Sequence, residues 1–363
     1  FIVNSAATSS TLLFVYGSGG NDTISVNTAN NAVMADYNTG SGISGFTRGV
    51  SVDLSSGADT LNPTGSATDA FGTDVLVNVR GVSATSLADT IFGTNFDDRF
   101  RGYAGNDYFN GRNGSDLVDY AMNASSQAVS VNLGSGAAND GLGGTDTLIS
   151  IEQVRATSSS DTLIGGNGSE LLRGNAGNDS IDGGAGSADV ADYRNATTGI
   201  TVNMATRVVQ DGQGGNDTLA GIEQIWGSTF NDSMLGGTGS DFFVGSSGAD
   251  TFSGGSGIDS VSYALNPANS TTATQGVSVN LTTGAGRDGY GGAESLVGIE
   301  VIYASSLADT ISGGAANEMF LGDAGNDQLS GAAGNDTLDG GNGDDTITGG
   351  AGDESILGGN GAD

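Results

Sequence analysis

Residues 102–119 contain two copies of one nine-residue pattern. They read Gly102-Tyr103-Ala104-Gly105-Asn106-Asp107-Tyr108-Phe109-Asn110 and Gly111-Arg112-Asn113-Gly114-Ser115-Asp116-Leu117-Val118-Asp119. Each copy places glycine first and fourth, aspartate sixth and an apolar residue eighth. The glycine-rich part predicts a tight turn, and the last three residues predict a short strand whose middle side chain points inward. Two copies would then form one coil of a parallel β-solenoid.

The same frame runs from Gly93 and returns over Asp161–Val190, over Gly227–Ser262 and from Asp309 onward. Its 18 complete copies carry 14 Asp, three Glu and one Ala at the sixth position. The eighth position is apolar throughout: Ile91, Phe100, Phe109, Val118, Leu163, Leu172, Ile181, Val190, Met234, Phe243, Phe252, Val261, Ile311, Phe320, Leu329, Leu338, Ile347 and Ile356. A phase held this long indicates a repeat architecture, which we expect to be all-β with negligible helix.

A longer period of roughly 70 to 83 residues overlies the short one, and each of its units opens with a tyrosine: Tyr37, Tyr120, Tyr193 and Tyr263. We therefore expect an N-terminal cap with one isolated repeat at 1–36 and repeat units at 37–119, 120–192, 193–262 and 263–363. The last unit has the longest nonapeptide array. Each unit also contains a strand-rich insert with a Gly/Asp turn. The sequence leaves open whether the inserts continue the solenoid or project from it.

Composition excludes several classes of function. Of 363 residues, 65 are Gly, 42 are acidic and 10 are basic, which gives a net charge of −32, and there is no His or Cys. A nucleic-acid binder needs a basic face, so we expect no nucleic-acid partner. Chemistry that needs imidazole or thiolate is absent. No apolar run is long enough to predict membrane insertion.

The repeated acids predict a metal ion. One inward side chain per nine residues contributes about 1.5 to 3 kcal/mol, whereas ordering each backbone residue costs about 1 to 2 kcal/mol. Sixth-position acids recur 18 residues apart in successive coils, so turns stack with carboxylates and carbonyls converging. Oxygen-only ligands suit a hard cation, above all Ca²⁺. The competing interpretation is a metal-free solenoid in which Asp merely favours turns.

The pattern Gly-Gly-x-Gly-x-Asp-x-U-x, with U apolar, resembles the RTX (repeats-in-toxin) family of bacterial secreted proteins. The resemblance implies a parallel β-roll with two rows of Ca²⁺ along its edges, disordered without calcium and folding after export through a type I secretion channel. It implies about ten ions. The ligand acids fall into pairs 18 residues apart: Asp89 with Asp107, Asp98 with Asp116, Asp161 with Asp179, Asp232 with Asp250, Asp241 with Asp259, Asp309 with Asp327, Glu318 with Asp336, Asp327 with Asp345, Asp336 with Glu354, and Asp345 with Asp363. The associated turn glycines are Gly102, Gly105, Gly236, Gly239, Gly322, Gly325, Gly331 and Gly334. Ala188 interrupts the frame and would leave Glu170 without a partner acid.

Three functions remain open on the sequence. The first is a secreted, extracellular structural protein of the bacterial cell surface, not an enzyme: a surface-layer, filament or matrix subunit, or an adhesin segment. Its expected partners are calcium ions, further copies joined end to end, and a surface polysaccharide. The second is the calcium-binding module of a secreted enzyme or toxin whose active domain lies upstream. The third is a polysaccharide-active β-helix using the carboxylate pairs Asp146/Glu152, Asp217/Glu223 and Glu294/Glu300.

Overall fold

The computed structural model describes residues 2–3, 13–16, 21–26, 33–37, 49–54, 64–68, 72–122, 127–264 and 273–363. The chain divides into two compact units, Phe1–Asp189 and Val190–Asp363. Much of the expected N-terminal cap, including Gly19 and Gly20, lies outside the described residues. The five-segment division of the sequence stays a prediction.

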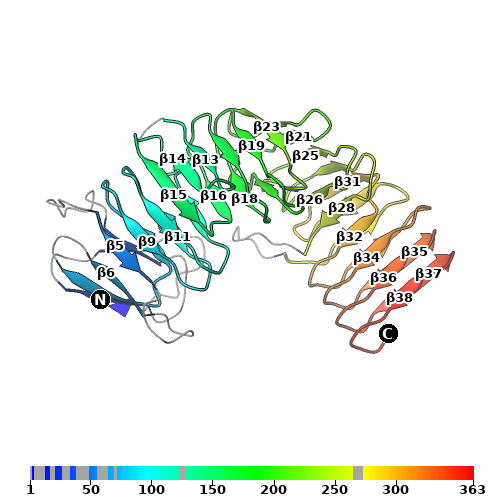
Figure 1. Cartoon of the computed structure of the whole chain (residues 1–363). Coiled ribbons are helices and arrows are strands. Elements are labelled where there is room, and N and C mark those ends of the chain that lie inside the picture. The colour runs from blue at the N-terminus through cyan, green and yellow to red at the C-terminus, as the bar shows by residue number, and fades with distance from the viewer. Residues whose placement is uncertain are drawn as a thin grey trace. The chain divides into compact units, whose positions relative to one another are not determined.

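Each unit consists of short strands in two sheets (Figure 1), here called sheet A and sheet B. In the first unit, sheet A contains β1 (Ile2–Val3), β3 (Thr23–Val26), β5 (Ser51–Asp53), β6 (Thr64–Thr68), β7 (Thr73–Val77), β9 (Thr90–Phe92), β11 (Tyr108–Asn110), β13 (Ser130–Asn132), β14 (Ala137–Asn139), β15 (Thr145–Ile149), β17 (Thr162–Ile164) and β19 (Ser180–Asp182). Sheet B contains β2 (Leu13–Tyr16), β4 (Val33–Asp36), β8 (Gly81–Ser83), β10 (Arg99–Arg101), β12 (Leu117–Asp119), β16 (Gln153–Arg155) and β18 (Leu171–Arg173).

The second unit is built in the same way. Its sheet A contains β21 (Thr201–Asn203), β22 (Val208–Gln210), β23 (Asn216–Ala220), β25 (Ser233–Leu235), β27 (Thr251–Ser253), β29 (Ser278–Asn280), β30 (Ala285–Arg287), β31 (Ala293–Val297), β33 (Thr310–Ser312), β35 (Gln328–Ala333) and β37 (Thr346–Ala351). Its sheet B contains β20 (Val190–Asp192), β24 (Gln224–Trp226), β26 (Phe242–Val244), β28 (Ser260–Ser262), β32 (Val301–Tyr303), β34 (Met319–Leu321), β36 (Thr337–Asp339) and β38 (Ser355–Leu357).

The strand register confirms the predicted coil. β11 pairs in parallel with β9, with Phe109 beside Ile91, and β36 pairs in parallel with β34, with Leu338 beside Phe320. Both registers span 18 residues, so two nonapeptides complete one coil and successive copies alternate between the sheets. The predicted all-β fold is therefore confirmed, and the described residues contain no helix. It follows that they contain no helix of the length and hydrophobicity that a bilayer crossing requires.

The inserts are built into sheet A. In the insert of residues 130–149, β13, β14 and β15 form an antiparallel meander. β15 also pairs in parallel with β11, and β13 with β17, while β12 in sheet B pairs directly with β16. The meanders β5–β7, β21–β23 and β29–β31 have the same antiparallel pairings. The inserts therefore continue the solenoid, which answers the question that the sequence left open.

The core lies between the two sheets and consists of eighth-position side chains. Phe100 of sheet B and Phe109 of sheet A are both fully buried, and their ring centroids are 5.8 Å apart. Phe243 and Phe252 repeat this contact in the second unit, at 6.2 Å. Such aromatic pairs contribute packing beyond the area that they bury.

Two positions correct the predicted inward set. In β20, Ala191 and not Val190 pairs with the inward Ile225, because one extra residue near Ala188 shifts the frame. In β38, Ile356 remains 51% exposed, since no further coil of the described chain packs against it.

Candidate metal sites

The sixth-position acids stack from coil to coil in several series, which together we call the carboxylate ladder. The backbone N–H of each acid donates a hydrogen bond to the carboxylate one coil further on: Asp89 to Oδ1 of Asp107, and Asp327 to Oδ1 of Asp345, both at 2.8 Å. The same bond joins Asp98 to Asp116, Asp161 to Asp179, Asp232 to Asp250, Asp241 to Asp259, Asp309 to Asp327, Glu318 to Asp336, and Asp345 to Asp363. The structure thus brings these predicted pairs together. The coils of Asp336 and Glu354 are joined here by a main-chain bond, in which Ser355 N donates to the Asp336 carbonyl.

The ladder also continues through the inserts, which the sequence analysis missed. Asp107 N donates to Oδ1 of Asp146 at 3.0 Å, and Asp116 N donates to Oε2 of Glu152 at 2.9 Å. In the second unit, Asp259 N donates to Oε2 of Glu300. An apolar residue two positions later, such as Leu148 after Asp146, is the signal that would have revealed these degenerate copies. Asp146 and Glu152, which the sequence analysis considered as an acid–base pair, are two separate members of the ladder.

The predicted break at Ala188 is wrong. Glu170 N donates to Oδ1 of Asp189 at 2.9 Å, so the acid of this coil lies 19 residues on instead of 18. The chain absorbs one additional residue in the turn because the strand position, rather than the sequence count, decides which acid meets the ladder. Glu170 therefore has its partner acid.

Several ladder acids keep one carboxylate oxygen open. Oδ2 of Asp107, Asp116, Asp327, Asp336 and Asp345 is buried and accepts no hydrogen bond. Asp116 is fully buried, and Asp107 is 2% exposed. Burial raises the pKa of both carboxyls to about 8, with the neighbouring carboxylates adding to the shift and the backbone hydrogen bonds opposing it. A buried anionic oxygen without a donor is costly, so these positions call for a positive partner.

Main-chain carbonyl oxygens lie close to the open carboxylate oxygens. A Cβ on Gly331 would lie 2.3 Å from Oδ2 of Asp336 and 2.6 Å from the Gly349 carbonyl oxygen one coil on. Gly322 and Gly340 likewise lie close to the carboxylate of the acid in their own turn and to a carbonyl oxygen one coil further on. Only glycine tolerates the close approach of the carboxylate and the carbonyl oxygen at these positions. Mixed carboxylate and carbonyl oxygens are the ligand set that Ca²⁺ takes.

Main-chain oxygens are essential to any such site. Within the described part of the chain, no three acidic side chains lie close enough together to hold a metal ion as a group. The carboxylates are spaced along the ladder instead, one per turn. A cation here would therefore be held by one or two carboxylates together with turn carbonyls.

The comparison with known families decides between the metal-bound and metal-free interpretations. The model of the RTX calcium-binding nonapeptide repeat matches residues 14–35, 83–118, 155–187, 226–261, 288–329 and 330–363, more than half of the chain. The chain belongs to the RTX calcium-binding nonapeptide-repeat family. It is thus a calcium-binding repeat protein. No curated protein matches the chain significantly.

The predicted RTX turn glycines differ in what they do. Gly102, Gly236, Gly322 and Gly331 each adjoin Oδ2 of the aspartate in their own turn. Gly334 has φ +129°, and its Cβ would lie 1.8 Å from the carbonyl oxygen of Ala316 in the preceding coil. Gly105 and Gly325 adopt the same left-handed conformation, whereas Gly239 is not left-handed and has open space around it. Gly239 is therefore the predicted glycine with no steric requirement.

Five RTX turns close through hydrogen bonds from a Ser or Thr, and we call them starter turns because four of them begin a nonapeptide array and the fifth follows directly in the first array. Each ends at an acid whose carboxylate accepts hydrogen bonds from the hydroxyl and backbone N–H of a Ser or Thr four residues earlier. They are Thr85–Asp89, Thr94–Asp98, Thr157–Asp161, Ser228–Asp232 and Ser305–Asp309.

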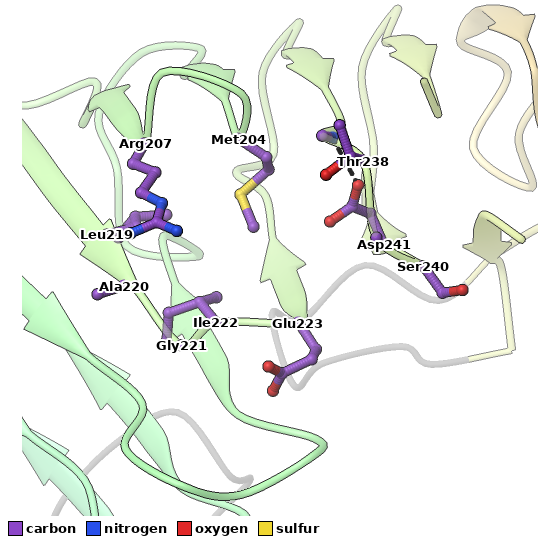
Figure 2. A pocket seen from close by; sticks show the side chains of 12 residues that line it. Met204, Arg207, Leu219, Ala220, Gly221, Ile222, Glu223, Thr238, Ser240 and Asp241 are labelled. Atoms are coloured by element: carbon purple, nitrogen blue, oxygen red, sulfur yellow. Dashed lines mark hydrogen bonds between the residues drawn. The ribbon is translucent and has the colours of Figure 1, made fainter. Parts of the chain in front are cut away.

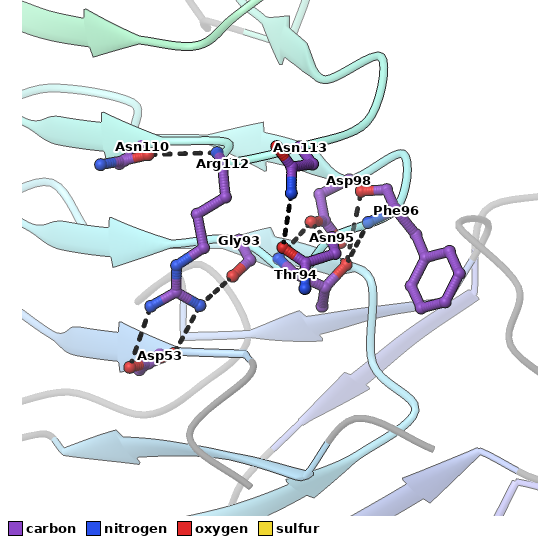
Figure 3. Close-up of polar contacts among 9 residues, drawn as sticks. All are labelled: Asp53, Gly93, Thr94, Asn95, Phe96, Asp98, Asn110, Arg112 and Asn113. Atoms are coloured by element: carbon purple, nitrogen blue, oxygen red, sulfur yellow. Dashed lines mark hydrogen bonds and ion pairs between the residues drawn. The ribbon is translucent and has the colours of Figure 1, made fainter. Parts of the chain in front are cut away.

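The starter turns also differ in backbone conformation. Figure 3 shows Thr94, whose hydroxyl bonds to Asp98 and accepts from Phe96 N. No residue of these described turns is left-handed, whereas Tyr103 and Gly105 in the next turn have φ of 64° and 129°. In four of them the acid also accepts a backbone N–H from the adjoining insert, as Asp161 does from Val129 at 2.7 Å. Only the Oδ1 atom of Asp98 is buried without a hydrogen bond. The other four carboxylates are hydrogen-bonded at both oxygens.

We expect Thr157→Val to destabilise the protein without changing the number of bound calcium ions. The substitution keeps the shape but removes a hydroxyl that donates to Asp161 and accepts from Ser159 N. Losing a buried bond to a charged group costs about 1 to 3 kcal/mol. Urea unfolding at saturating calcium measures the cost, and elemental analysis counts the ions. Thr162→Val, on the outward side of β17, is the matched control and should stay within about 0.5 kcal/mol. A lost ion in T157V would contradict this account of the turn.

An open groove of about 320 Å³ lies beside the third insert (Figure 2). Met204 and Arg207 line one side of it and Asp241 the other. Asp241 is engaged in its own turn, where Oδ2 accepts from Gly237 N at 2.7 Å. Arg207 has φ +61°, and the equivalent residues of two other inserts, Gly136 and Gly284, are glycines with φ near the same value. The arginine therefore carries backbone strain that the neighbouring inserts avoid.

Proposed function

We propose that this chain is a secreted, calcium-binding structural protein of the bacterial cell surface that folds and assembles when it binds Ca²⁺. One observation carries the proposal: the carboxylate ladder continues through the inserts in both units. The nonapeptide arrays and the segments between them are therefore parts of one repeating structure. A surface-layer, filament or matrix subunit, or an adhesin segment, is the role that such a continuous roll fits.

The open oxygens support a narrower ligand set than the sequence predicted. In the pair Asp309 with Asp327, for example, Ser305 donates to both oxygens of Asp309 while Asp327 keeps Oδ2 open. We propose that the acids with open oxygens bind calcium and that Asp89, Asp161, Asp232 and Asp309, which accept hydrogen bonds at both oxygens, position strands. The proposed calcium ligands are then led by Asp107, Asp116, Asp327, Asp336 and Asp345.

Charge and surface composition support assembly. The net charge of −32 opposes association of copies until cations neutralise part of it. Two of the four inserts also expose an apolar side chain at the same position, Ile149 in β15 at 41% and Val297 in β31 at 61%. Exposed apolar groups that recur on a regular surface favour contacts between copies.

Light scattering and negative-stain microscopy during a calcium titration test the proposal. We expect polymers or sheets above the calcium concentration that folds the chain, reversed by EGTA, and none with Mg²⁺ at equal ionic strength. A calcium-folded monomer at all protein concentrations would overturn the structural role and favour the second function, a calcium-binding module of a secreted enzyme or toxin. The sequence of the complete gene then separates the two, because the module requires a catalytic domain elsewhere in it.

A further inference from the structure

The turn between β30 and β31 carries an acid that lies outside the sixth-position pattern. Asp288 directly precedes the glycine-rich segment Gly289–Gly292 and is 1% exposed. Its Oδ1 accepts hydrogen bonds from the backbone N–H groups of Tyr290 and Gly292. Its Oδ2 is buried and accepts no hydrogen bond. The turn therefore holds the carboxylate in place and leaves one oxygen available.

A main-chain carbonyl faces the same space. A Cβ on Gly292 would lie 1.5 Å from the Gly248 carbonyl oxygen and 2.8 Å from Oδ2 of Asp288. Gly248 belongs to the RTX turn that ends at Asp250, one coil earlier on the ladder. The absence of a side chain at residue 292 thus lets a carboxylate and a carbonyl from two coils approach the same point.

Two ladder acids, Asp250 and Glu294, adjoin this point, and few hydrogen bonds compensate their buried negative charge. Asp250 N lies 3.4 Å from Oε1 of Glu294, a longer contact than the 3.0 Å between Asp107 N and Asp146. Burial raises the pKa of Asp250 to about 9, with Glu294, Asp232 and Asp288 contributing. Burial, with Asp288 next, raises the pKa of Glu294 to about 8. Within the described residues, no arginine forms an ion pair with any of these carboxylates.

A buried hydroxyl marks the same place. Tyr263 is the fourth of the unit-marking tyrosines, and its hydroxyl is buried without a hydrogen-bond partner. Burial raises its pKa well above 10, and Glu294, Asp250 and Asp288 add to the shift. In the first unit the equivalent Tyr120 donates to Oδ2 of Asp146 at 2.9 Å. Where that insert has Asp146, this one has the longer Glu294, and the hydroxyl bond is not made.

We propose that Asp288, Asp250 and Glu294, together with the Gly248 carbonyl, form an additional calcium site at the fourth insert. The proposal rests on the proposed function, because it assumes a calcium-binding chain. It adds Asp288, a ligand that lies outside the nonapeptide copies. The three acids are not at mutual ligand distances in the structure. Glu294 supplies the reach, since its additional methylene allows the carboxylate to turn toward Asp288. Oxygen ligands from carboxylates and a carbonyl match a hard divalent cation.

The first unit has a related arrangement. A Cβ on Gly144 would lie 1.6 Å from the Gly105 carbonyl oxygen and 2.6 Å from Oδ2 of Asp140. There, however, Asp146 is held by Tyr120. The ladder acid therefore differs between the two inserts. Asp146 is held by a hydrogen bond from Tyr120, whereas Glu294 accepts no hydrogen bond from Tyr263.

Two substitutions test the site, with bound calcium counted by elemental analysis after equilibrium dialysis. Asp288→Asn keeps an oxygen for the Tyr290 and Gly292 N–H groups but removes the charge, and we expect one ion fewer per chain. Glu294→Asp recreates the Asp–Tyr pair of the first unit, so a purely structural role predicts an unchanged ion count and equal or higher stability. The proposed site predicts one ion fewer, or at least a tenfold weaker affinity at one site, with the fold intact by circular dichroism.

Asp353→Asn is the matched control, because Asp353 is an exposed fifth-position acid and should leave the count unchanged. Wild-type counts in both D288N and E294D would overturn the inference while leaving the proposed function standing. A wild-type chain that binds no calcium would instead remove the proposed function itself.

Discussion

Withdrawing calcium with EGTA at pH 7.5 is expected to remove most of the β-strand signal of the chain in far-ultraviolet circular dichroism. The chain carries a net charge of −32, and its ladder stacks buried carboxylates such as Asp107, Asp116 and Asp336 at the turns. Without cations these charges repel one another and lack donors for their open oxygens, so the expanded chain is favoured and ion binding is coupled to folding. Added Ca²⁺ should restore the signal, and Mg²⁺ at equal ionic strength should restore much less of it, because Mg²⁺ retains its waters and requires an octahedral site.

Lowering the pH in the presence of EGTA should partly replace calcium. The folded pKa values of Asp107 and Asp116 are about 8 and that of Asp250 about 9, all above the value near 3.8 of an exposed aspartate. Between these limits the folded state binds more protons than the unfolded state, so its stability falls as the pH rises and increases as the pH falls. We expect the strand signal in EGTA to grow between pH 8 and pH 5. An EGTA-treated chain that is already fully β at pH 7.5 would contradict the calcium-dependent fold.

Replacing Phe243 by alanine is expected to cost about 3 to 5 kcal/mol, a large share of the stability of a single unit. Phe243 is fully buried and stacks on Phe252 between the two sheets. The core is one side chain deep at each strand, so few neighbours can move into the cavity. Urea unfolding at saturating calcium gives the change in free energy of unfolding.

Ile258→Ala is the control for this measurement. Ile258 lies in a turn of the same array and is 62% exposed, so its truncation should stay within about 0.5 kcal/mol. A loss below about 1 kcal/mol in F243A would mean that the eighth-position side chains do not carry the core.

The regular copies made the roll predictable from sequence. Asp107 and Phe109 recur at 18-residue intervals, and this spacing is also the strand register, so periodicity indicated both the fold and the stacking of acids. Asp146 and Glu152 were harder to recognise because their copies lack the full glycine pattern. In the structure, pairing of β15 with β11 and of β16 with β12 brings them onto the ladder across 39 and 36 residues.

Other features depend on contacts that a linear pattern does not contain. Asp189 replaces the residue at the expected position because the turn accommodates one more residue before the strand pairs. Thr85 and Ser305 occupy the second position of copies that lack glycine at the first and fourth positions, and their hydroxyl geometry shows that their acids are already hydrogen-bonded. Asp288 lies outside the frame altogether, so that counting sixth positions does not reach it.

The starter turns give the growth of each array a direction. A turn such as Thr157–Asp161 closes through hydrogen bonds between residues only four apart, and Asp161 also accepts from Val129 N of the preceding insert. Once closed, it presents an ordered strand edge on which the next coil can register, and the bond from Asp161 N to Asp179 is the first rung added. We therefore expect each array to fold from its starter turn and to add coils one after another toward the C-terminus. Damage late in an array then leaves the earlier coils in register, whereas damage to a starter turn weakens the edge on which the later coils register.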